Sequence, residues 1–357
     1  MAVAAPTPAT WNNILSTTMH NYHKTLTDNI FNTLPLLEFY KSNGRVKTIN
    51  GGISIVEPIM IAEGDSGSYA EWDQIIVTPK DTATAAQFLW KQIFATIAIS
   101  GLEEAQNNGK EQIINLLEAK IMQAEETLKK RLNGQLFGTQ VTPTAKDFTS
   151  LLILVDDAAP AGGITPTAPD TYWKSYVKDV GGSVDAAKLE TELRTAYFAT
   201  SDAGPDHTDA IFTNPYGFGL YESTLTPQVR YTDTKKANLG FQNLMFKDVP
   251  IMWDFQCPGV VTGVGAAQVG TTSNTSACFF GLNSKYIGLK IHAERNFKQS
   301  PFTDNLSGSV ASTAPAGVGA ASATALDARV SFITTYGNQT TRNRRRLWKL
   351  TNVREGV

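Results

Sequence analysis

Cysteine is scarce in this chain. Only two, Cys257 and Cys278, occur among 357 residues, and neither belongs to a CxxC pair. This count excludes a disulfide framework and argues against a metal knuckle. A single disulfide between the two stays open, but we expect a reduced pair, as is usual in the cytoplasm.

An excess of charge of one sign and long apolar runs are missing too. Lys and Arg number 31 against 33 Asp and Glu, so the net charge of −2 points to neither nucleic acid nor a membrane surface. No apolar run reaches the roughly 18 residues of a membrane span, so we expect no contact with a membrane. The opening MAVAAPTPATW lacks the basic and apolar regions of a signal peptide, so we expect none.

The sequence also lacks the motifs of common catalytic and cofactor sites. HExxH, GxSxG, the phosphate-binding GxxxxGK motif and a GxGxxG after a strand do not occur. The four histidines show no metal-ligand spacing: His20, His23, His207 and His292. We expect Asp156 and Asp157 to be a solvated loop pair rather than a catalytic dyad. The sequence therefore predicts no catalytic residue, no cofactor and no metal ion, and we expect the chain not to be an enzyme.

The clearest pattern that is present runs from residue 109 to 133. Its apolar residues recur at helical steps along one stripe: Ile113, Leu117, Ile121, Leu128, Leu132 and, just beyond, Leu136. Breaker residues Gly109 and Gly134 stand at its two ends. We predict an amphipathic helix over 109–133, roughly 37 Å long at ~1.5 Å per residue.

Residues 45 to 80 are rich in strand-forming residues, yet their outer half is polar. The pattern indicates strands separated by a Gly51-Gly52 turn and an acidic turn. The outer half carries Glu57, Glu63, Asp65, Glu71, Trp72 and Asp73. Because so polar an excursion cannot close on a core of its own, we predict a two-stranded arm that projects onto something else. These six residues are the predicted interface residues of the arm.

Shorter patterns predict the remaining elements. Residues 88–99 are apolar at alternate positions on both faces, which favours a strand buried on both sides. Residues 148–155 predict a short strand, and 185–199 predict a helix that opens a second lobe. Asn214 is expected to cap another helix.

Toward the C-terminus, residues 248–254 and 278–282 are expected to be paired strands around a long glycine-rich loop. Residues 305–326 are small and uncharged and predict a second long loop. The last segment predicts two strands around a turn at Tyr336-Gly337-Asn338.

One basic cluster stands out near the end of the chain: Arg342, Arg344, Arg345 and Arg346, followed by Lys349. Alternation on a strand would place Arg342, Arg344 and Arg346 on one face. The plain interpretation is a solvated strand face. The functional interpretations are contact with the acidic arm of a neighbouring subunit, which we favour, or contact with phosphates without sequence readout.

The order of these elements, from polar arm to final strands, resembles the major capsid proteins of tailed bacteriophages, which have the Hong Kong 97-type fold. The segments that carry the resemblance are FLWKQIFATIAISGLEEAQNNGKEQIINLLEAKIMQAEETLKKRLNGQLF, GGITPTAPDTYWKSYV, ANLGFQNLMFKDVPIMWDFQCP, CFFGLNSKYIGLKIH and RVSFITTYGNQTTRNRRRLWKL. The resemblance implies an α+β fold with an N-terminal arm at 1–44 and an E-loop at 45–82. A P-domain would comprise 83–159, with the spine helix at 109–133, and 286–357, and an A-domain would comprise 160–285.

The resemblance also implies a function. The chain would self-assemble into hexamers and pentamers of an icosahedral shell around double-stranded DNA, bound without sequence specificity. It would be part of the virion capsid, made in the host cytoplasm. Its partners would be itself, a portal protein, and scaffolding or decoration proteins. The alternative with the same fold is an encapsulin-type shell around a protein cargo. A soluble α/β enzyme and another virion component, such as a tail or decoration protein, are further alternatives.

Overall fold

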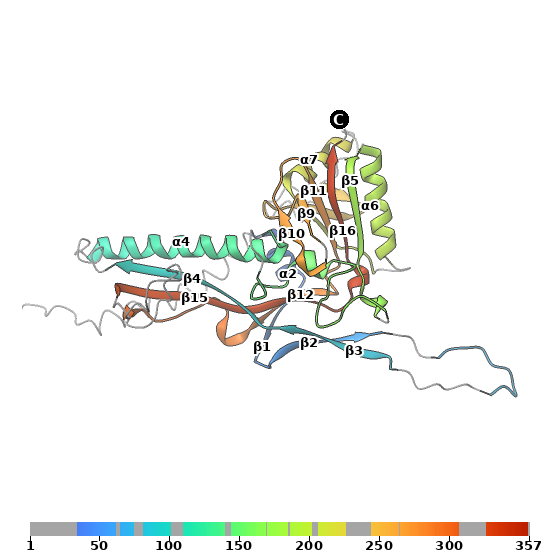
Figure 1. The fold of residues 1–357 in the computed structure, drawn as a ribbon, viewed down its shortest axis with the longest axis horizontal. Coiled ribbons are helices and arrows are strands. Elements are labelled where there is room, and N and C mark those ends of the chain that lie inside the picture. Colours follow the sequence, from blue (N-terminus) through green and yellow to red (C-terminus); the bar gives the residue numbers. More distant parts are fainter. Residues whose placement is uncertain are drawn as a thin grey trace, which may run out of the picture. The chain divides into compact units, whose positions relative to one another are not determined.

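The computed structural model of the chain contains both helices and strands (Figure 1). The structure describes residues 34–61, 65–74, 81–100, 110–139, 144–168, 170–184, 186–201, 206–225, 244–263, 265–306 and 326–355. The predictions for residues 1–33 and for most of the loop at 305–326 lie outside these ranges. The described residues fall into two compact units: the first contains Gln92–Leu132 and His292–Tyr336, and the second contains Leu34–Lys91, Asn133–Ile291 and Gly337–Val357.

The long helix α4 spans Lys110–Phe137 and so confirms the predicted helix, with a later end. Its apolar stripe is buried at Ile121, Leu128, Leu132 and Leu136, whereas the side chains of Ile113 and Leu117 lie outside the described part. Gly134 does not stop the helix. Gly138 does, because its positive φ of 82° lets its N–H bond back to the Gly134 carbonyl, at 2.8 Å.

Two strands, β3 (Ala83–Leu89) and β4 (Lys91–Ser100), replace the single strand predicted at 88–99. The prediction that this strand is buried on both faces is wrong for β4. Ile93, Ala95 and Ile97 are buried, but Phe94 on the opposite face is 67% exposed. The polar neighbours of Phe94 on that face, Gln92 and Thr96, were the signal that it faces outward.

The longest strand, β15 (Leu326–Thr341), runs straight through the predicted turn at Tyr336-Gly337-Asn338. A Cβ at Gly337 would lie 2.6 Å from the Lys290 carbonyl oxygen, so glycine serves close strand pairing here and not a turn. Up to Tyr336, β15 pairs with β4, β13 (Lys298–Gln299) and β14 (Thr303–Leu306) in the first unit. From Gly337 on, it pairs in the second unit with β12 (Ile287–His292), which in turn pairs with β1 (Val46–Ile49).

The second unit also holds a sheet with the strand order β5-β16-β11-β6-β8-β7. These strands are β5 (Tyr176–Val184), β6 (Ala210–Thr213), β7 (Leu244–Phe246), β8 (Val249–Trp253), β11 (Ala277–Leu282) and β16 (Trp348–Glu355). The final strand β16 therefore pairs with β5 and β11 rather than with β15, so the two closing strands are not a pair. Likewise β8 and β11, predicted to pair directly, lie on either side of β6. Alternation in a sequence shows a strand but not its neighbours.

The core of this sheet is packed by apolar side chains of the strands and of two helices, α6 (Ala186–Thr200) and α7 (Pro215–Thr224). Both helices confirm the sequence predictions, and Asn214 accepts a hydrogen bond from the Gly217 N–H as the expected cap. Gly281 on β11 lies opposite Trp348 on β16, and any Cβ at Gly281 would overlap the indole. Trp348 is fully buried and donates its indole N–H to Thr208 Oγ1, at 2.9 Å.

Two other loop and strand predictions are wrong. Residues 148–155 contain a short helix, α5 (Leu151–Leu154), whose four apolar residues in a row carry no period that separates helix from strand. The glycine-rich stretch after β8 contains a hairpin of β9 (Val260–Thr262) and β10 (Val269–Thr271). Near the start of the described chain, helix α2 (Pro35–Ser42) has proline at its first position and is followed by Asn43-Gly44. Cys257 and Cys278 are free and buried.

Candidate functional site

The arm consists of β2 (Ser54–Met60) and β3, which pair antiparallel from Ser54 opposite Leu89 to Met60 opposite Ala83 (Figure 1). The second strand therefore lies beyond the predicted range of 45–80. One face of this ladder is buried at Ile55, Ile59 and Phe88. The strand before it, β1, pairs with β12 instead, so the arm consists of β2, β3 and the segment that joins them.

The base of the arm is fixed by a close contact with the loop at 161–164. The Gln87 N–H donates to the Gly162 carbonyl oxygen, at 2.8 Å. A Cβ at Gly162 would lie 2.7 Å from the Cβ of Ala86 and 3.0 Å from the Phe88 ring, and the φ of Gly162 is +62°. Glycine is therefore required at this position by both space and backbone conformation.

The tip of the arm, defined here as residues 65–74, is exposed throughout. It contains Asp65, Glu71, Trp72 and Asp73 of the predicted interface residues, whereas Glu63 lies outside the described residues. The carboxylate of Asp73 accepts a hydrogen bond from the Ala70 N–H at 2.8 Å, and the Asp73 N–H donates to the Ala70 carbonyl at 3.1 Å. This small turn holds Trp72, 94% exposed, between two carboxylates.

Glu57 is not part of the polar outer half of the arm, which corrects its place among the predicted interface residues. It lies on the buried face of β2 and is only 2% exposed. Its carboxylate accepts from Arg342 Nε at 2.5 Å, from Lys290 Nζ at 2.9 Å and from Thr340 Oγ1 at 3.2 Å. Burial alone would raise the pKa of Glu57, but hydrogen bonds and charge from Arg342 and Lys290 hold it below the usual value. Arg342 thus binds the arm of its own chain.

The arginine cluster is not a strand, so the predicted alternation of Arg342, Arg344 and Arg346 is wrong. Residues Arg344–Arg346 form a single 3₁₀ turn between β15 and β16, capped by Asn343, whose side chain accepts from the Arg345 N–H. Asn343 favours such a turn because its side-chain oxygen satisfies a backbone N–H. The Arg345 side chain is exposed, and Arg346 donates to the Thr200 carbonyl at 3.2 Å.

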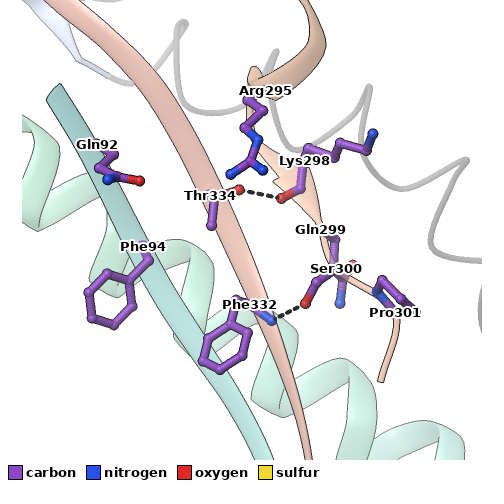
Figure 2. A pocket seen from close by; sticks show the side chains of 9 residues that line it. All are labelled: Gln92, Phe94, Arg295, Lys298, Gln299, Ser300, Pro301, Phe332 and Thr334. Atoms are coloured by element: carbon purple, nitrogen blue, oxygen red, sulfur yellow. Dashed lines mark hydrogen bonds between the residues drawn. The ribbon is translucent and has the colours of Figure 1, made fainter. Parts of the chain in front are cut away.

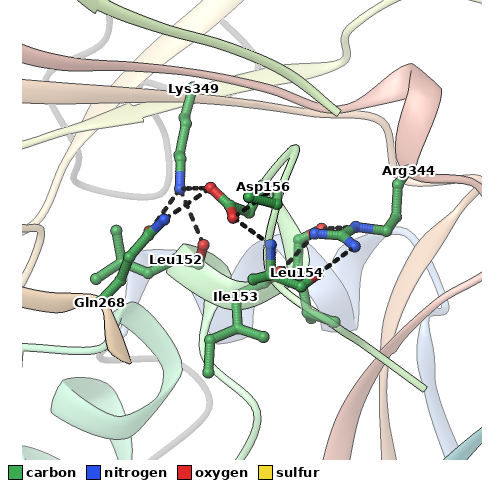
Figure 3. Close-up of polar contacts among 9 residues, drawn as sticks. Leu152, Ile153, Leu154, Asp156, Gln268, Arg344 and Lys349 are labelled. Atoms are coloured by element: carbon green, nitrogen blue, oxygen red, sulfur yellow. Dashed lines mark hydrogen bonds and ion pairs between the residues drawn. The ribbon is translucent and has the colours of Figure 1, made fainter. Parts of the chain in front are cut away.

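Arg344 is fully buried, which corrects its place in the predicted basic cluster. Its guanidinium donates to three backbone carbonyls at the end of α5 and just after it: Ile153 at 2.8 Å, Leu154 at 2.9 Å and Ala159 at 2.8 Å. Burial lowers the pKa of Arg344 to about 10, so the group stays charged at neutral pH. Figure 3 shows this contact beside a second buried cation, Lys349.

Lys349 and Asp156 form a buried ion pair, each side chain 1% exposed, with 2.7 Å between Nζ and Oδ1. Lys349 also donates to the Leu152 carbonyl and to Gln268 Oε1, and Asp156 accepts from Gln268 and from the N–H groups of Ala158 and Ala159 (Figure 3). Asp156 is therefore not the solvated residue that we expected. Burial alone would raise the pKa of Asp156, but the Lys349 charge and these hydrogen bonds lower it.

The buried carboxylates of Glu57 and Asp156 are both bound by internal donors. Within the described ranges, no group of three or more His, Cys, Asp or Glu residues could hold a metal ion. Among those residues, too, no helix combines the length and apolar character that crossing a bilayer needs. The polar clusters around Glu57, Asp156 and Arg344 join segments that are distant in the sequence.

A surface groove that the sequence analysis missed lies in the first unit. It has a volume of 520 Å³ and is lined by Phe94 of β4, Phe332 of β15 and Pro301, with Arg295 and Lys298 at its rim. Figure 2 shows the two phenylalanine rings on the neighbouring strands and the two cations on the adjacent segment. The exposed face of β4, once recognised from Gln92 and Thr96, was the signal that could have found it.

No protein-family model and no curated protein matches this chain. Several solved structures do match this chain. The chain from the cyanophage A-1(L) capsid asymmetric unit superposes with a TM-score of 0.54 at 15% identity, over 88% of this chain and 93% of that one. The structure of Gordonia phage Cozz matches with a TM-score of 0.52 at 11% identity, over 87% and 85%. The capsid of a native GTA particle matches with a TM-score of 0.53 at 9% identity, over 87% and 89%.

Because these identities are low, the likeness is one of fold, and it extends over most of both chains. The protein has a mixed helix and sheet fold of the kind found in phage capsid chains. At the level of fold, this confirms the resemblance drawn from the order of its sequence segments.

Proposed function

We propose that this chain is the major capsid protein of a tailed bacteriophage, which assembles with copies of itself into hexamers and pentamers of an icosahedral shell around double-stranded DNA. The observation that carries the proposal is the fold likeness to phage and GTA capsid chains, which covers 87–88% of this chain. The role is structural rather than catalytic, and the protein's location is the virion capsid. The phage and GTA particles among the structural relatives favour this shell over an encapsulin-type one.

A Hong Kong 97-type layout suits the elements described. The arm of β2 and β3 corresponds to the E-loop, and α4 to the spine helix of the P-domain. The sheet that contains β5 and β11, with α6 and α7, corresponds to the A-domain, and β16 joins that sheet from the C-terminal segment. Residues 1–44 would be the N-terminal arm. The exposed tip, with Asp65, Glu71, Trp72 and Asp73, is the part of the E-loop that we assign to contact with a neighbouring subunit.

The partners beyond the chain itself follow from the same proposal. A portal protein and scaffolding or decoration proteins would join the shell. Arg345, exposed on the 3₁₀ turn, would contact DNA phosphates or an acidic neighbour, as would Arg342, whose side chain is 45% exposed. Neither contact would read a base sequence.

The test is to express the full chain, purify the assembled fraction and image it by negative-stain microscopy. Shells or capsomers are expected, and shells from infected cells should contain nuclease-protected DNA rather than a protein cargo. A chain that stays monomeric at every concentration, or particles filled with one protein, would contradict the proposal.

A matched variant tests the arm. Replacing residues 62–80 with a short Gly/Ser linker should leave the circular dichroism and melting of the subunit unchanged, because every described residue of this segment is exposed. The same variant should form no shells. Normal shells would show that assembly does not need this segment. Loss of the fold would show that the segment serves folding rather than assembly.

A further inference from the structure

The groove of the first unit is apolar at its floor and basic at its rim. Phe94, 67% exposed, and Phe332 lie on the outward face of β4 and β15, opposite the buried residues Ile93 and Ile97 (Figure 2). Among the described residues that line it there are two cations, Arg295 and Lys298, and no carboxylate. An exposed aromatic surface of this kind marks an interaction site, because covering it removes apolar area from water.

The rim is built with some strain. Phe297, between the two cations, is 1% exposed and has a φ of +49°, a conformation that is costly for an aromatic residue. Its N–H donates to Thr335 Oγ1, at 3.3 Å. Arg295 lies over the Tyr336 ring, 4.9 Å from its centroid, and Lys298 is exposed. The buried Phe297 therefore anchors a turn that presents both cations beside the aromatic floor.

The tip of the arm has the complementary composition. Between residues 65 and 74 it carries Asp65, Glu71 and Asp73, no cation, and two exposed aromatic side chains. Trp72 is 94% and Tyr69 is 70% exposed. A buried aromatic side chain covers about 150–250 Å², so docking Trp72 on the groove would remove the largest exposed aromatic of the tip from water.

We infer that the groove of Phe94 and Phe332 is the receptor for the arm tip of a second copy of this chain. Trp72 packs against Phe94 and Phe332, while Glu71 and Asp73 lie near Arg295 and Lys298. This inference rests on the proposed function, in that copies of the chain must assemble, and it names the surface that receives the arm. Protein interfaces commonly combine buried aromatic anchors with opposite charges at the rim.

The basic pocket beside Glu57 is the competing receptor, and its size decides against it. It is lined by Arg45, Lys47, Lys285, Lys290 and Arg342, but its volume is 20 Å³, room for about one water molecule. An indole does not enter it. Lys290 and Arg342 are also already bound to Glu57.

Cysteine crosslinking tests the inference directly, because the two native cysteines are fully buried. Trp72→Cys and Phe94→Cys subunits, made separately, are mixed, assembled and mildly oxidised. A disulfide-linked dimer is the expected main product on a non-reducing gel. The matched control replaces Phe94→Cys with Phe255→Cys, which is 70% exposed in the second unit and should give little dimer.

Three results would overturn the inference while leaving the proposed function intact. They are shells without the 72–94 crosslink, a crosslink of Trp72→Cys to Arg45→Cys instead, and a Trp72→Cys/Phe94→Cys double variant that links only within one chain. Failure of the unmodified chain to form any shell or capsomer would overturn the proposed function instead.

Assembly thresholds give a second measurement. Trp72→Ala and Phe94→Ala should each raise the subunit concentration needed for assembly by roughly thirtyfold, the effect of losing an interface hot spot. Phe198→Ala, which removes an aromatic of similar exposure elsewhere, should change it little. Lys298→Glu should weaken assembly, and Asp73→Lys in the same chain should restore part of it. Equal effects of Phe94→Ala and Phe198→Ala would contradict the inference.

Discussion

Lys349 and Asp156 bind one another entirely inside the protein, on β16 and just after α5, with no solvent contact for either charge. Such a pair is costly to break, because removal of one partner leaves the other charge buried without compensation. Lys349 also caps α5 through the Leu152 carbonyl, next to the carbonyls that Arg344 binds. The two cations thus oppose the negative end of a helix of four residues.

Lys349→Met should therefore lower the free energy of unfolding by about 3–5 kcal/mol. The measurement is urea unfolding of the unassembled subunit. In the double variant Lys349→Met/Asp156→Leu, which leaves no unpaired charge, a large part of this loss should be recovered. A double variant no more stable than the single one would show that the ion pair itself is not the source of the effect.

Arg344 and Arg345 offer a matched comparison within one turn. Arg344→Lys keeps the charge but cannot reach three carbonyls with one ammonium group, so it should cost about 2–4 kcal/mol of unfolding free energy. Arg345→Lys, on the exposed neighbour, should stay within about 0.5 kcal/mol of the parent protein. Thermal or urea unfolding of both variants checks the difference, and equal stability would refute the role given to Arg344.

The acid response of the arm base follows from Glu57. Burial raises its pKa, but the bonds from Arg342 and Lys290 outweigh this and leave it below the ordinary value. A carboxyl with a lowered folded pKa contributes stability that is complete above its unfolded pKa, about 4.3, and is lost as pH falls through the folded value. Glu57→Gln should thus be less stable than the parent at about pH 7, and the gap should narrow below about pH 4. The exposed Glu71→Gln serves as control, and a gap that stays constant with pH would contradict this account.

Substitutions at two adjacent glycines can distinguish the cost of backbone strain from the cost of a steric clash. Gly162 and Gly163 both have positive φ, 62° and 77°, but only Gly162 faces Ala86 and Phe88 of the arm, and a Cβ at Gly163 meets nothing within 4 Å. Gly163→Ala should cost about 1 kcal/mol from conformation alone. Gly162→Ala should cost about 2–4 kcal/mol, because overpacking adds to it. Urea unfolding of the two variants measures the difference, and equal losses would show that the loop yields to the arm.

Elements with a strong local signal were predictable from the sequence. The stripe of Leu128, Leu132 and Leu136 indicated α4, and Asn214 indicated the start of α7, because both signals act within a few residues. The partners of charged residues were not predictable. Glu57 and Arg342 are 285 positions apart, and nothing in either neighbourhood says that they meet.

Glycine and short apolar runs misled for a related reason. Gly134 and Gly337 both resemble breaker positions, yet one sits inside a helix and the other inside a strand that approaches Lys290 closely. The four consecutive apolar residues Leu151–Leu154 are compatible with either a strand or a helix. Gly337 meets the Lys290 carbonyl, and the carbonyls of Ile153 and Leu152 bind Arg344 and Lys349, so at these two places contacts from distant parts of the chain override the local preference.

The opposition of Gly281 and Trp348 has an evolutionary consequence. Because a Cβ at position 281 would overlap the indole, the two positions cannot change independently while the strands keep their register. Homologues that keep tryptophan at 348 are expected to keep glycine at 281, and alanine or serine should appear at 281 only where 348 has become smaller. The residue at position 348 of β16 therefore limits which residue types selection can accept at position 281 of β11.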